Sequence, residues 1–465
     1  MTWLHRRPDS NRLSSPNAGS DEDGQRRPAR RRRLSAAAVA VAMGVAAAAT
    51  SGAIAFAPVS AASGPLVIAD LAPFTGPDAA LGGYYAASCL AAITAMNKDG
   101  GVLGQQLSCA NFDTRGDPAD AVPAANQMFA TTPNLAMVIG CTSDEAASVV
   151  PIINSHKMVA FCMTGQSEFD HVHYPYFFRL VPPDLAESYA MVAIAKYTKH
   201  YKKIALAFGN DIGSQTFVNP AIKSVKAAGL KLTANVTLDL TANTFRTEAE
   251  QVVQSHPDVI LTEALGSAEA TFLSEVKQLN HGKMIPVIGT SATIDPSWFS
   301  SVGAAIGKKT LAKYYVADNL VTATAGPEFT PFNDAMQAVK SQVTADDAGS
   351  LQTLLSGPGA VHLFDGMNLA ALAMIMAKST VPSAYKPDIL KIGDGVKGAV
   401  VVNSFAQGKA DLAAGKAIRY IGPGGPTSFD SYHDSPGIFQ IDGYKASGAV
   451  TVVGGITTAD YRAVQ

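Results

Sequence analysis

The sequence predicts an α/β protein built from two Rossmann-like lobes, each with a parallel sheet, joined by a three-strand hinge. Short uncharged runs typical of buried strands alternate with helical segments, and this alternation occurs twice, on either side of Pro182-Pro183. Two further strand patterns around a glycine turn follow near the C-terminus, after helices that return to the first lobe. Lobes joined in this way typically close over a ligand.

The first 33 residues differ in composition from the rest of the chain. They hold nine Arg and no Lys among many Pro, Ser, Asn and Asp residues, which predicts a disordered basic tail over 1–33. An Ala- and Val-rich uncharged stretch follows, and then small residues such as Val59-Ser60-Ala61. This order is the layout of a secretory signal, so 34–62 is expected to be a signal peptide or an uncleaved membrane anchor. Arg32-Arg33-Leu34 also permits a twin-arginine export route.

Removal of this segment changes the charge balance. Residues 1–61 carry nine of the 36 basic and four of the 38 acidic residues, so the exported part holds 27 basic and 34 acidic residues, a net charge of −7. A nucleic-acid-binding surface needs a basic stripe, so no nucleic-acid partner is expected.

The first lobe is expected over 63–183 and 318–436. Its elements follow from uncharged strand runs, and from helical segments that end in glycine caps such as Gly100-Gly101. The expected strands are 66–69, 106–111, 136–139, 158–161 and 176–180, and the expected helices are 82–96, 119–130, a helix from Ser143, 331–343 and 362–378.

The second lobe is expected over 184–317 and 437–465. It repeats the strand–helix alternation, with 313–317 crossing back toward the first lobe. The expected helices are 186–200, 216–228, 245–255 and 267–279, and the expected strands are 203–208, 231–236, 258–262, 285–289, 437–441 and 450–453.

One turn of the first lobe organises the expected ligand site. The strand 136–139 ends at Gly140, and Ser143 followed by Asp144 and Glu145 is a typical helix start, so Ser143 is either a helix cap or part of a site. Such turns lie at the carboxyl edge of a parallel sheet, where ligands bind and where helix N-termini attract anions. We expect the two acids to complement the helix N-terminus and to point to solvent.

The four cysteines all lie between residues 89 and 162. An even number in an exported chain predicts disulfides, the alternative being four buried free thiols. If the strand order is 2-1-3-4-5, Cys141 and Cys162 follow neighbouring strands, and Cys89 and Cys109 lie on an adjacent helix and strand. We therefore expect the pairs Cys89–Cys109 and Cys141–Cys162.

Motifs for catalysis are absent from the sequence. It has no G-x-S-x-G, no H-E-x-x-H, no phosphate-cradling Gly-Lys-Ser/Thr loop and no G-x-G-x-x-G after a strand. His171 and His173 form the only close histidine pair, and without a third ligand nearby they predict a solvated loop rather than a metal site. No enzyme activity, cofactor or metal is expected.

Several short motifs, taken in their order and spacing, resemble one family. The motifs are Phe74-Thr75-Gly76-Pro77, 97–104, 112–118, Val138-Ile139-Gly140, Phe178-Arg179, 422–429 and 437–441. Through them the chain is similar, over nearly all of 65–455, to the type I periplasmic solute-binding proteins of ABC transporters, in the branched-chain amino-acid-binding (leucine-binding) family. The resemblance implies the type I periplasmic binding protein fold and a ligand cleft between the lobes. It also implies that the protein is a monomer whose partner is an ABC permease in the membrane.

The resemblance also implies which residues bind the ligand. Ser143 matches the family serine that holds an α-carboxylate, and Thr164-Gly165-Gln166 match the second contact loop, so these turns form an expected anion cradle.

Other positions depart from the family. Leu81 stands where relatives have an aromatic residue, and Ile212 and Leu265 stand where they have Tyr. Ser291 replaces the acid that holds the ammonium group, and Glu263 is the nearest substitute. We therefore expect the ligand to be a small carboxylate, an amino acid or an apolar organic acid.

The expected function is that of an extracytoplasmic receptor, in the cell envelope or outside the cell, that delivers a small molecule to a permease. The alternative is a membrane-anchored ligand sensor or cell-envelope protein of the same fold without a transport role, because fold does not determine function.

Overall fold

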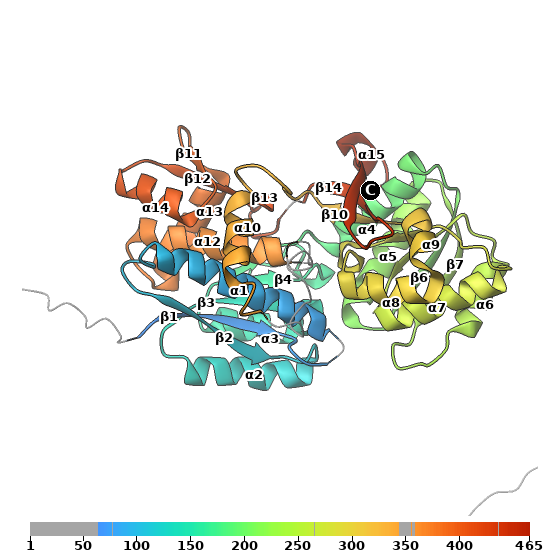
Figure 1. Cartoon of the computed structure of the whole chain (residues 1–465), viewed down its shortest axis with the longest axis horizontal. Coiled ribbons are helices and arrows are strands. Elements are labelled where there is room, and N and C mark those ends of the chain that lie inside the picture. Colours follow the sequence, from blue (N-terminus) through green and yellow to red (C-terminus); the bar gives the residue numbers. More distant parts are fainter. Residues whose placement is uncertain (1–63, 77, 265, 344–354, 356–358, 436) are drawn as a thin grey trace, which may run out of the picture. The chain divides into compact units, whose positions relative to one another are not determined.

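The structure is a computed structural model that describes residues 64–76, 78–264, 266–343, 355, 359–435 and 437–465 (Figure 1). The expected basic tail, the signal segment and Leu265 lie outside the described residues. The described chain contains a five-stranded sheet, a seven-stranded sheet and a small three-stranded sheet.

The five-stranded sheet is parallel and has the order β2-β1-β3-β4-β5, which confirms the predicted strand order. Its strands are β1 Leu66–Ala72, β2 Leu107–Asp113, β3 Leu135–Thr142, β4 Ala160–Met163 and β5 Phe177–Arg179.

Helices cover both faces of this sheet. Side chains of neighbouring β1 positions point to opposite sides, Ile68 into the core with α1, α10 and α12 and Ala69 into the core with α2 and α3. These elements form the first lobe together with the small sheet and with α13 and α14, whose side chains join the same core. The helices are α1 Ala79–Lys98, α2 Pro118–Thr131, α3 Ser143–Ser155, α10 Thr330–Val339, α12 Ala360–Ala377, α13 Pro382–Asp394 and α14 Phe405–Ala413.

The small sheet, α13 and α14 were not expected from the sequence. Its strands are β11 Val400–Val402, β12 Ile418–Gly422 and β13 Gly425–Pro426. Helix α12 is the described helix that is long and apolar enough to cross a membrane by composition, but 78% of that stretch is buried against the rest of the first lobe. It is therefore the central helix of a protein core.

The seven-stranded sheet has the order β15-β14-β10-β9-β8-β6-β7 and forms the second lobe. Strands β6 to β10 are parallel, whereas β14 pairs antiparallel with β10 and β15 pairs antiparallel with β14. The two strands expected around a glycine turn are β14 and β15, and Gly448 lies in the tight turn that returns β15 directly onto β14. The strands are β6 Lys203–Gly209, β7 Lys231–Leu238, β8 Val259–Glu263, β9 Val287–Gly289, β10 Tyr315–Leu320, β14 Phe439–Tyr444 and β15 Val450–Gly455.

Helices also cover both faces of the second sheet. Two of them, α8 and α9, were missed by the sequence analysis, which placed a strand over residues that belong partly to α9. The helices are α4 Asp184–Ala193, α5 Ile212–Ala227, α6 Arg246–Gln254, α7 Gly266–Leu279, α8 Pro296–Ile306, α9 Lys308–Tyr314 and α15 Thr458–Arg462. The chain passes between the two lobes three times, after β5, after β10 and before β14.

Both expected cysteine pairs are present as disulfides. Cys89 of α1 is bonded to Cys109 of β2, and Cys141 of β3 is bonded to Cys162 of β4. No free thiol remains, because all four cysteines lie in the described part of the chain.

Candidate ligand cleft between the lobes

The turn after β3 begins two residues later than the sequence indicated. Strand β3 does not end at Gly140 but continues to Thr142, with a register shift against β4 between these two residues. Gly140 has a φ of 100°, and a Cβ there would lie 2.7 Å from the carbonyl oxygen of Leu71 on β1. Only glycine fits both the positive φ and the close approach, so Gly140 sets the irregular end of β3 from which α3 starts.

Thr142, and not Ser143, is the cap of α3. Glu145 folds back, and its carboxylate accepts hydrogen bonds from the Thr142 backbone N–H at 3.0 Å and from the Thr142 hydroxyl at 2.5 Å. It also accepts the Thr114 hydroxyl at 3.2 Å. Glu145 is fully buried, which corrects the expectation that it points to solvent. Burial raises the pKa of Glu145 to about 7, while the bonds from Thr142 act in the opposite direction.

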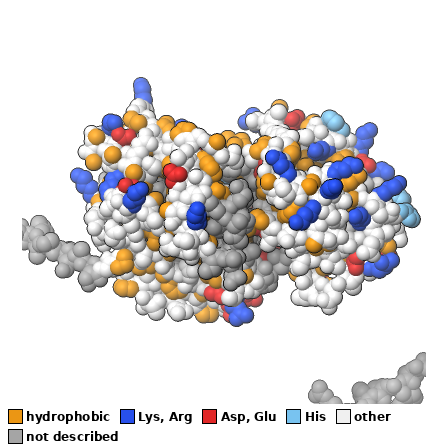
Figure 2. All heavy atoms as spheres, in the orientation of Figure 1, with side chains coloured by type: hydrophobic (Ala, Val, Ile, Leu, Met, Phe, Trp, Pro, Cys, Tyr) orange, Lys and Arg blue, Asp and Glu red, His pale blue; other side chains and the backbone are white. Residues whose placement is uncertain are grey.

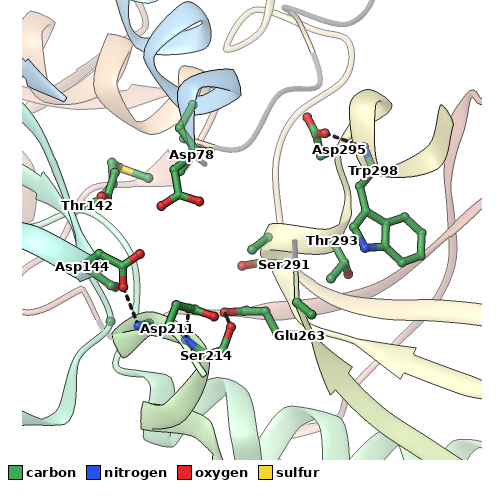
Figure 3. A pocket seen from close by; sticks show the side chains of 18 of the residues that line it. Asp78, Thr142, Asp144, Asp211, Ser214, Glu263, Ser291, Thr293, Asp295 and Trp298 are labelled. Atoms are coloured by element: carbon green, nitrogen blue, oxygen red, sulfur yellow. Dashed lines mark hydrogen bonds between the residues drawn. The ribbon is translucent and has the colours of Figure 1, made fainter. Parts of the chain in front are cut away.

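Asp144 does not point to solvent either, because its Oδ1 accepts the backbone N–H of Gly213 at 2.8 Å. Gly213 lies in the first turn of α5, so this bond joins the N-terminal ends of two helices from different lobes. Asp78, in the loop before α1, faces the same side of the cavity as Asp144 (Figure 3). Burial, followed by the nearby charges of Asp78 and Asp211, raises the pKa of Asp144 to about 8.

The second lobe brings its own acids to this place. Asp211 caps α5, because its Oδ1 accepts the backbone N–H of Ser214 at 2.7 Å. Glu263, at the end of β8, accepts the hydroxyls of Ser214 at 3.4 Å and of Thr290. Burial raises the pKa of Glu263 well above its ordinary value.

A cavity of about 670 Å³ lies between these elements, and Figure 3 shows acids of both lobes around it. Seven carboxyl groups line the cavity, and none of its described lining residues is Lys or Arg. His362 also lines it, but burial lowers the pKa of His362 to about 4, so the ring is neutral at physiological pH. The seven acids are Asp78, Asp144, Asp184, Glu187, Asp211, Glu263 and Asp295.

The nearest buried base is already paired. Arg179 of β5 is fully buried, with its Nη1 2.8 Å from an oxygen of Asp170 and its Nε 3.1 Å from an oxygen of Asp434. Asp184 is 5% exposed, accepts the Thr216 hydroxyl, and has its pKa raised by burial and only partly lowered by Arg179. Arg179 therefore does not balance the seven acids that line the cavity. Figure 2 shows Lys and Arg side chains spread over the outer surface instead.

The remainder of the wall is apolar. It includes aliphatic and aromatic side chains of both lobes, among them Leu81, Tyr85, Met163, Phe217, Leu240 and Trp298. A second bond between the lobes lies beside this wall, where the Tyr84 hydroxyl of α1 donates to Asp295. Asp295 also caps α8, because it accepts the backbone N–H of Trp298 at 2.8 Å.

Five of the predicted site residues line the cavity, namely Leu81, Ser143, Gly165, Glu263 and Ser291. Two others are buried beside it. The Thr164 hydroxyl lies 3.3 Å from that of Ser143, and Gln166 uses its carbonyl oxygen to accept a bond from Arg179 at 3.3 Å.

Ile212 does not belong to the cavity. It is 45% exposed at the start of α5, because the helix begins at Ile212 and turns its side chain outward, while its neighbours Asp211 and Gly213 face the first lobe. The expectation that Ile212 lines the site is therefore wrong. Leu265 lies outside the described residues.

Most of the acids that line the cavity were not expected as site residues from the sequence. Ser291 replaces the family acid, yet its hydroxyl and backbone N–H both bond to Glu187 of α4, at 3.0 and 3.3 Å, so an acid reaches this position from another helix. Asp211 had a usable sequence signature, since Asp directly before a helix is a typical cap. Nothing in the local sequence indicated that Asp78 would face Asp144.

No metal centre is formed within the described ranges, where no cluster of His, Cys, Asp and Glu has a suitable arrangement. The predicted pair His171 and His173 lies elsewhere, on the loop before β5.

Comparisons with known proteins agree with this architecture. A family model described as periplasmic binding protein matches residues 65–357. A Leu/Ile/Val-binding protein of Rhizobium johnstonii is 37% identical over 75 residues, which is 16% of this chain and 20% of that protein. The chain thus matches only a fifth of the length of this curated relative.

Solved structures are similar over most of the chain. A leucine-binding protein of Thermotoga maritima has a TM-score of 0.67 at 16% identity, covering 85% of this chain and 99% of its own. A branched-chain amino acid transporter substrate-binding protein of Streptococcus pneumoniae, in complex with isoleucine, has a TM-score of 0.65 at 16% identity, with 84% and 99% covered. A solute-binding protein of R. palustris in complex with benzoate has a TM-score of 0.64 at 16% identity, with 85% and 97% covered.

Identities this low show the fold alone, whereas the family model spans more than half of the sequence. The resemblance predicted from the sequence is confirmed, and the chain belongs to the periplasmic binding protein family, whose members bind solutes and are not enzymes.

Proposed function

We propose that the protein is an extracytoplasmic receptor of an ABC importer, which captures a small organic molecule between its lobes and delivers it to a membrane permease. The observation that carries this proposal is the cavity of about 670 Å³, lined by side chains from both lobes. Its size suits a small ligand. The bonds Asp144–Gly213 and Tyr84–Asp295 are contacts that form when the lobes approach, as hinge closure over a ligand requires.

The cavity also bears on the expected ligand. A small carboxylate was expected at Ser143 and Gly165, which line the cavity at the start of α3 and after β4. Seven acids line the cavity without a Lys or Arg among the described lining residues, so a ligand of net negative charge finds no cationic partner there. The lining therefore favours a ligand that carries an amine, and disfavours an organic acid that lacks one.

A thermal-shift screen of the exported protein against amines, amino acids, aromatic acids and short-chain acids tests the receptor function. A ligand that binds only the folded state raises the melting temperature by mass action. The Ser143→Phe variant, which places a ring in the cavity, should abolish the shift. The control is Ser155→Phe, at the exposed end of the same helix, which should leave the shift unchanged.

The transport role needs a second measurement. Cells that lack the gene should take up the identified ligand more slowly, and the wild-type gene should restore uptake where Ser143→Phe does not. Unchanged uptake, together with an N-terminus that remains uncleaved, would instead support the membrane-anchored sensor.

A further inference from the structure

Asp78 and Asp144 face one another on the first-lobe side of the cavity (Figure 3). Both side chains line the cavity. Asp78 precedes α1 but its side chain does not cap the helix, so helix capping does not account for its position. Two carboxyl groups that face one another are stabilised by a shared proton or by a cation beside them.

A third carboxyl group comes from the other lobe. Asp144 and Asp211 lie on either side of Gly213, where a Cβ would be 3.6 Å from an oxygen of Asp144 and 3.5 Å from an oxygen of Asp211. Both line the same cavity as Asp78. One oxygen of Asp211 caps α5, while the other is buried and has no hydrogen-bond partner among the described residues. An unpartnered carboxylate oxygen that is removed from water requires a donor or a positive charge.

The chain supplies no such charge at this place. Arg179 is committed to Asp170 and Asp434, and the described part of the chain forms no metal cluster. The internal positions that the structure does not describe contain neither Lys nor Arg in the sequence.

We propose that the ligand of this cleft is an organic cation, whose ammonium or guanidinium group is held by Asp78 and Asp144 of the first lobe and Asp211 of the second. This inference rests on the proposed receptor function and names its ligand class. A cation between the lobes offsets the repulsion among the three acids, so closure is favoured when the ligand is bound. The aliphatic and aromatic wall near Leu81 and Phe217 receives the apolar body of the ligand.

The contacts of Asp144 and Asp211 with α5 alone would fit a purely structural role, in which acids join two helix ends. Asp78 separates the two interpretations, because it lines the cavity and its side chain does not cap a helix. A structural role predicts that removing the Asp78 charge leaves ligand affinity unchanged. The cation proposal predicts a large loss.

Three compounds that share a 3-methylbutyl chain distinguish the ligand classes by calorimetry. 3-Methylbutylamine carries only the ammonium group, leucine carries ammonium and carboxylate, and 4-methylpentanoate carries only the carboxylate. The proposal predicts that the amine binds more tightly than leucine and that the carboxylate does not bind. Pentane-1,5-diamine and calcium chloride are added to test a second ammonium group and an inorganic cation.

The matched variants are Asp78→Asn and Asp99→Asn, which each remove one carboxylate at opposite ends of α1. Asp99 is exposed and distant from the cavity lining. We expect Asp78→Asn to weaken amine binding by about tenfold or more, as loss of one partner of a buried charge pair does. Asp99→Asn should not change it.

A pH series gives an independent measurement. Burial raises the pKa of Asp78 to about 6 and that of Asp144 to about 8. Burial also raises the pKa values of Glu187 and Glu263 in the same cavity. The empty cleft therefore holds protons that a bound cation displaces. The pKa of Asp184 is raised by burial as well, and the neutral His362 ring adds no charge. Amine affinity should therefore fall between pH 8 and pH 6, by up to about tenfold per pH unit for each proton displaced.

Three results would overturn the proposal. These are tighter binding of 4-methylpentanoate or leucine than of the amines, full stabilisation by calcium alone, or amine binding that Asp78→Asn leaves unchanged. In each of them the receptor function stands if Ser143→Phe blocks an organic ligand. If no organic compound of any class binds, the receptor function itself is refuted.

Discussion

At the scale of single residues, the first turn of α3 shows how one position changes the role of its neighbours. Thr142 caps the helix and Glu145 folds back onto it, so Ser143 is left without a capping role and faces the cavity. Asp144, next along the turn, reaches the other lobe. Three adjacent polar residues therefore serve the fold, the ligand site and the contact between lobes.

We predict that Thr142→Ala lowers the free energy of unfolding by about 1 kcal/mol, the usual cost of a lost helix cap. Ser143→Ala should change it by less than about 0.5 kcal/mol, because Ser143 does not cap α3 and, among the described residues, its hydroxyl contacts only that of Thr164, at 3.3 Å. Urea denaturation of both variants measures the difference. The reverse order would mean that Ser143 is the cap.

At the scale of elements, the cleft is formed where helices of the two lobes meet end to end. The N-terminal end of α3 meets that of α5 through Asp144 and Gly213, and α1 meets that of α8 through Tyr84 and Asp295. In both contacts a carboxylate lies at a helix N-terminus, where the partial positive charge of the helix favours it.

Removing one of these contacts should favour the open form. We predict that Tyr84→Phe lowers the free energy of unfolding by about 1–3 kcal/mol, because a buried carboxylate oxygen of Asp295 loses its hydrogen-bond donor. It should also increase the radius of gyration of the ligand-free protein in small-angle X-ray scattering. The control is Tyr385→Phe, which removes a 2.7 Å bond to Ala136 within the first lobe. That variant should be destabilised without expanding, and equal expansion of both variants would contradict this role of Tyr84.

The disulfides cross-link elements of the first lobe beside the site. Each closes a loop of 20 or 21 residues, and Cys141–Cys162 joins the ends of β3 and β4, from which Ser143 and Gly165 reach the cavity. We predict that replacing both Cys141 and Cys162 by Ser lowers the free energy of unfolding by about 3 kcal/mol, as chain entropy indicates for a loop of this length. Denaturation under non-reducing conditions measures this. Peptide mapping that finds Cys109 bonded to Cys141 would show that the pairing is different.

At the scale of the whole molecule, buried acids link stability to pH. Burial raises the pKa of Glu145 and Glu187 to about 7 and that of Asp144, Glu269 and Asp365 to about 8. The folded protein therefore binds more protons than the unfolded chain between the ordinary carboxyl range and pH 8. Stability is then greatest at the acidic end of this window and falls as pH rises through it.

We predict that the melting temperature of the ligand-free protein falls between pH 5 and pH 8. Glu269→Gln should make the decline shallower, by up to about 1.4 kcal/mol per pH unit for the one proton removed. The amide keeps an oxygen that can accept the bond from the Trp298 ring, which is 3.0 Å long in the wild type. Calorimetric melts at several pH values test this, and a melting temperature that rises with pH would contradict the pKa directions.

The N-terminal 61 residues give one prediction that rests on sequence alone. The basic, then apolar, then small-residue order predicts export with loss of about the first 61 residues. N-terminal sequencing of the exported protein measures this. Recovery of the arginine run would show that the segment is retained, as a membrane anchor requires.

The sequence by itself determined the α/β architecture and the order of the first sheet. Buried parallel strands are uncharged runs and their crossovers are helical, so local pattern and a general handedness rule are sufficient. The same reasoning paired the four cysteines, because neighbouring strands bring Cys141 to Cys162. The resemblance to the family named five residues that line the cavity. Four of them, Ser143, Gly165, Glu263 and Ser291, lie at or just after the carboxyl ends of parallel strands, which meet at one edge.

Only the tertiary structure decided the charge of the cleft. Asp78, Glu187 and Asp211 are each ordinary near a helix start, and nothing in their local sequence indicates that they converge from separate elements. Whether Ile212 or its neighbours faces the first lobe depends on where α5 begins, and a shift of one residue turns a helical side chain by about 100°. Contacts between distant segments set the electrostatics of a site, so the ligand expected from aligned positions changed once the folded chain brought the acids together.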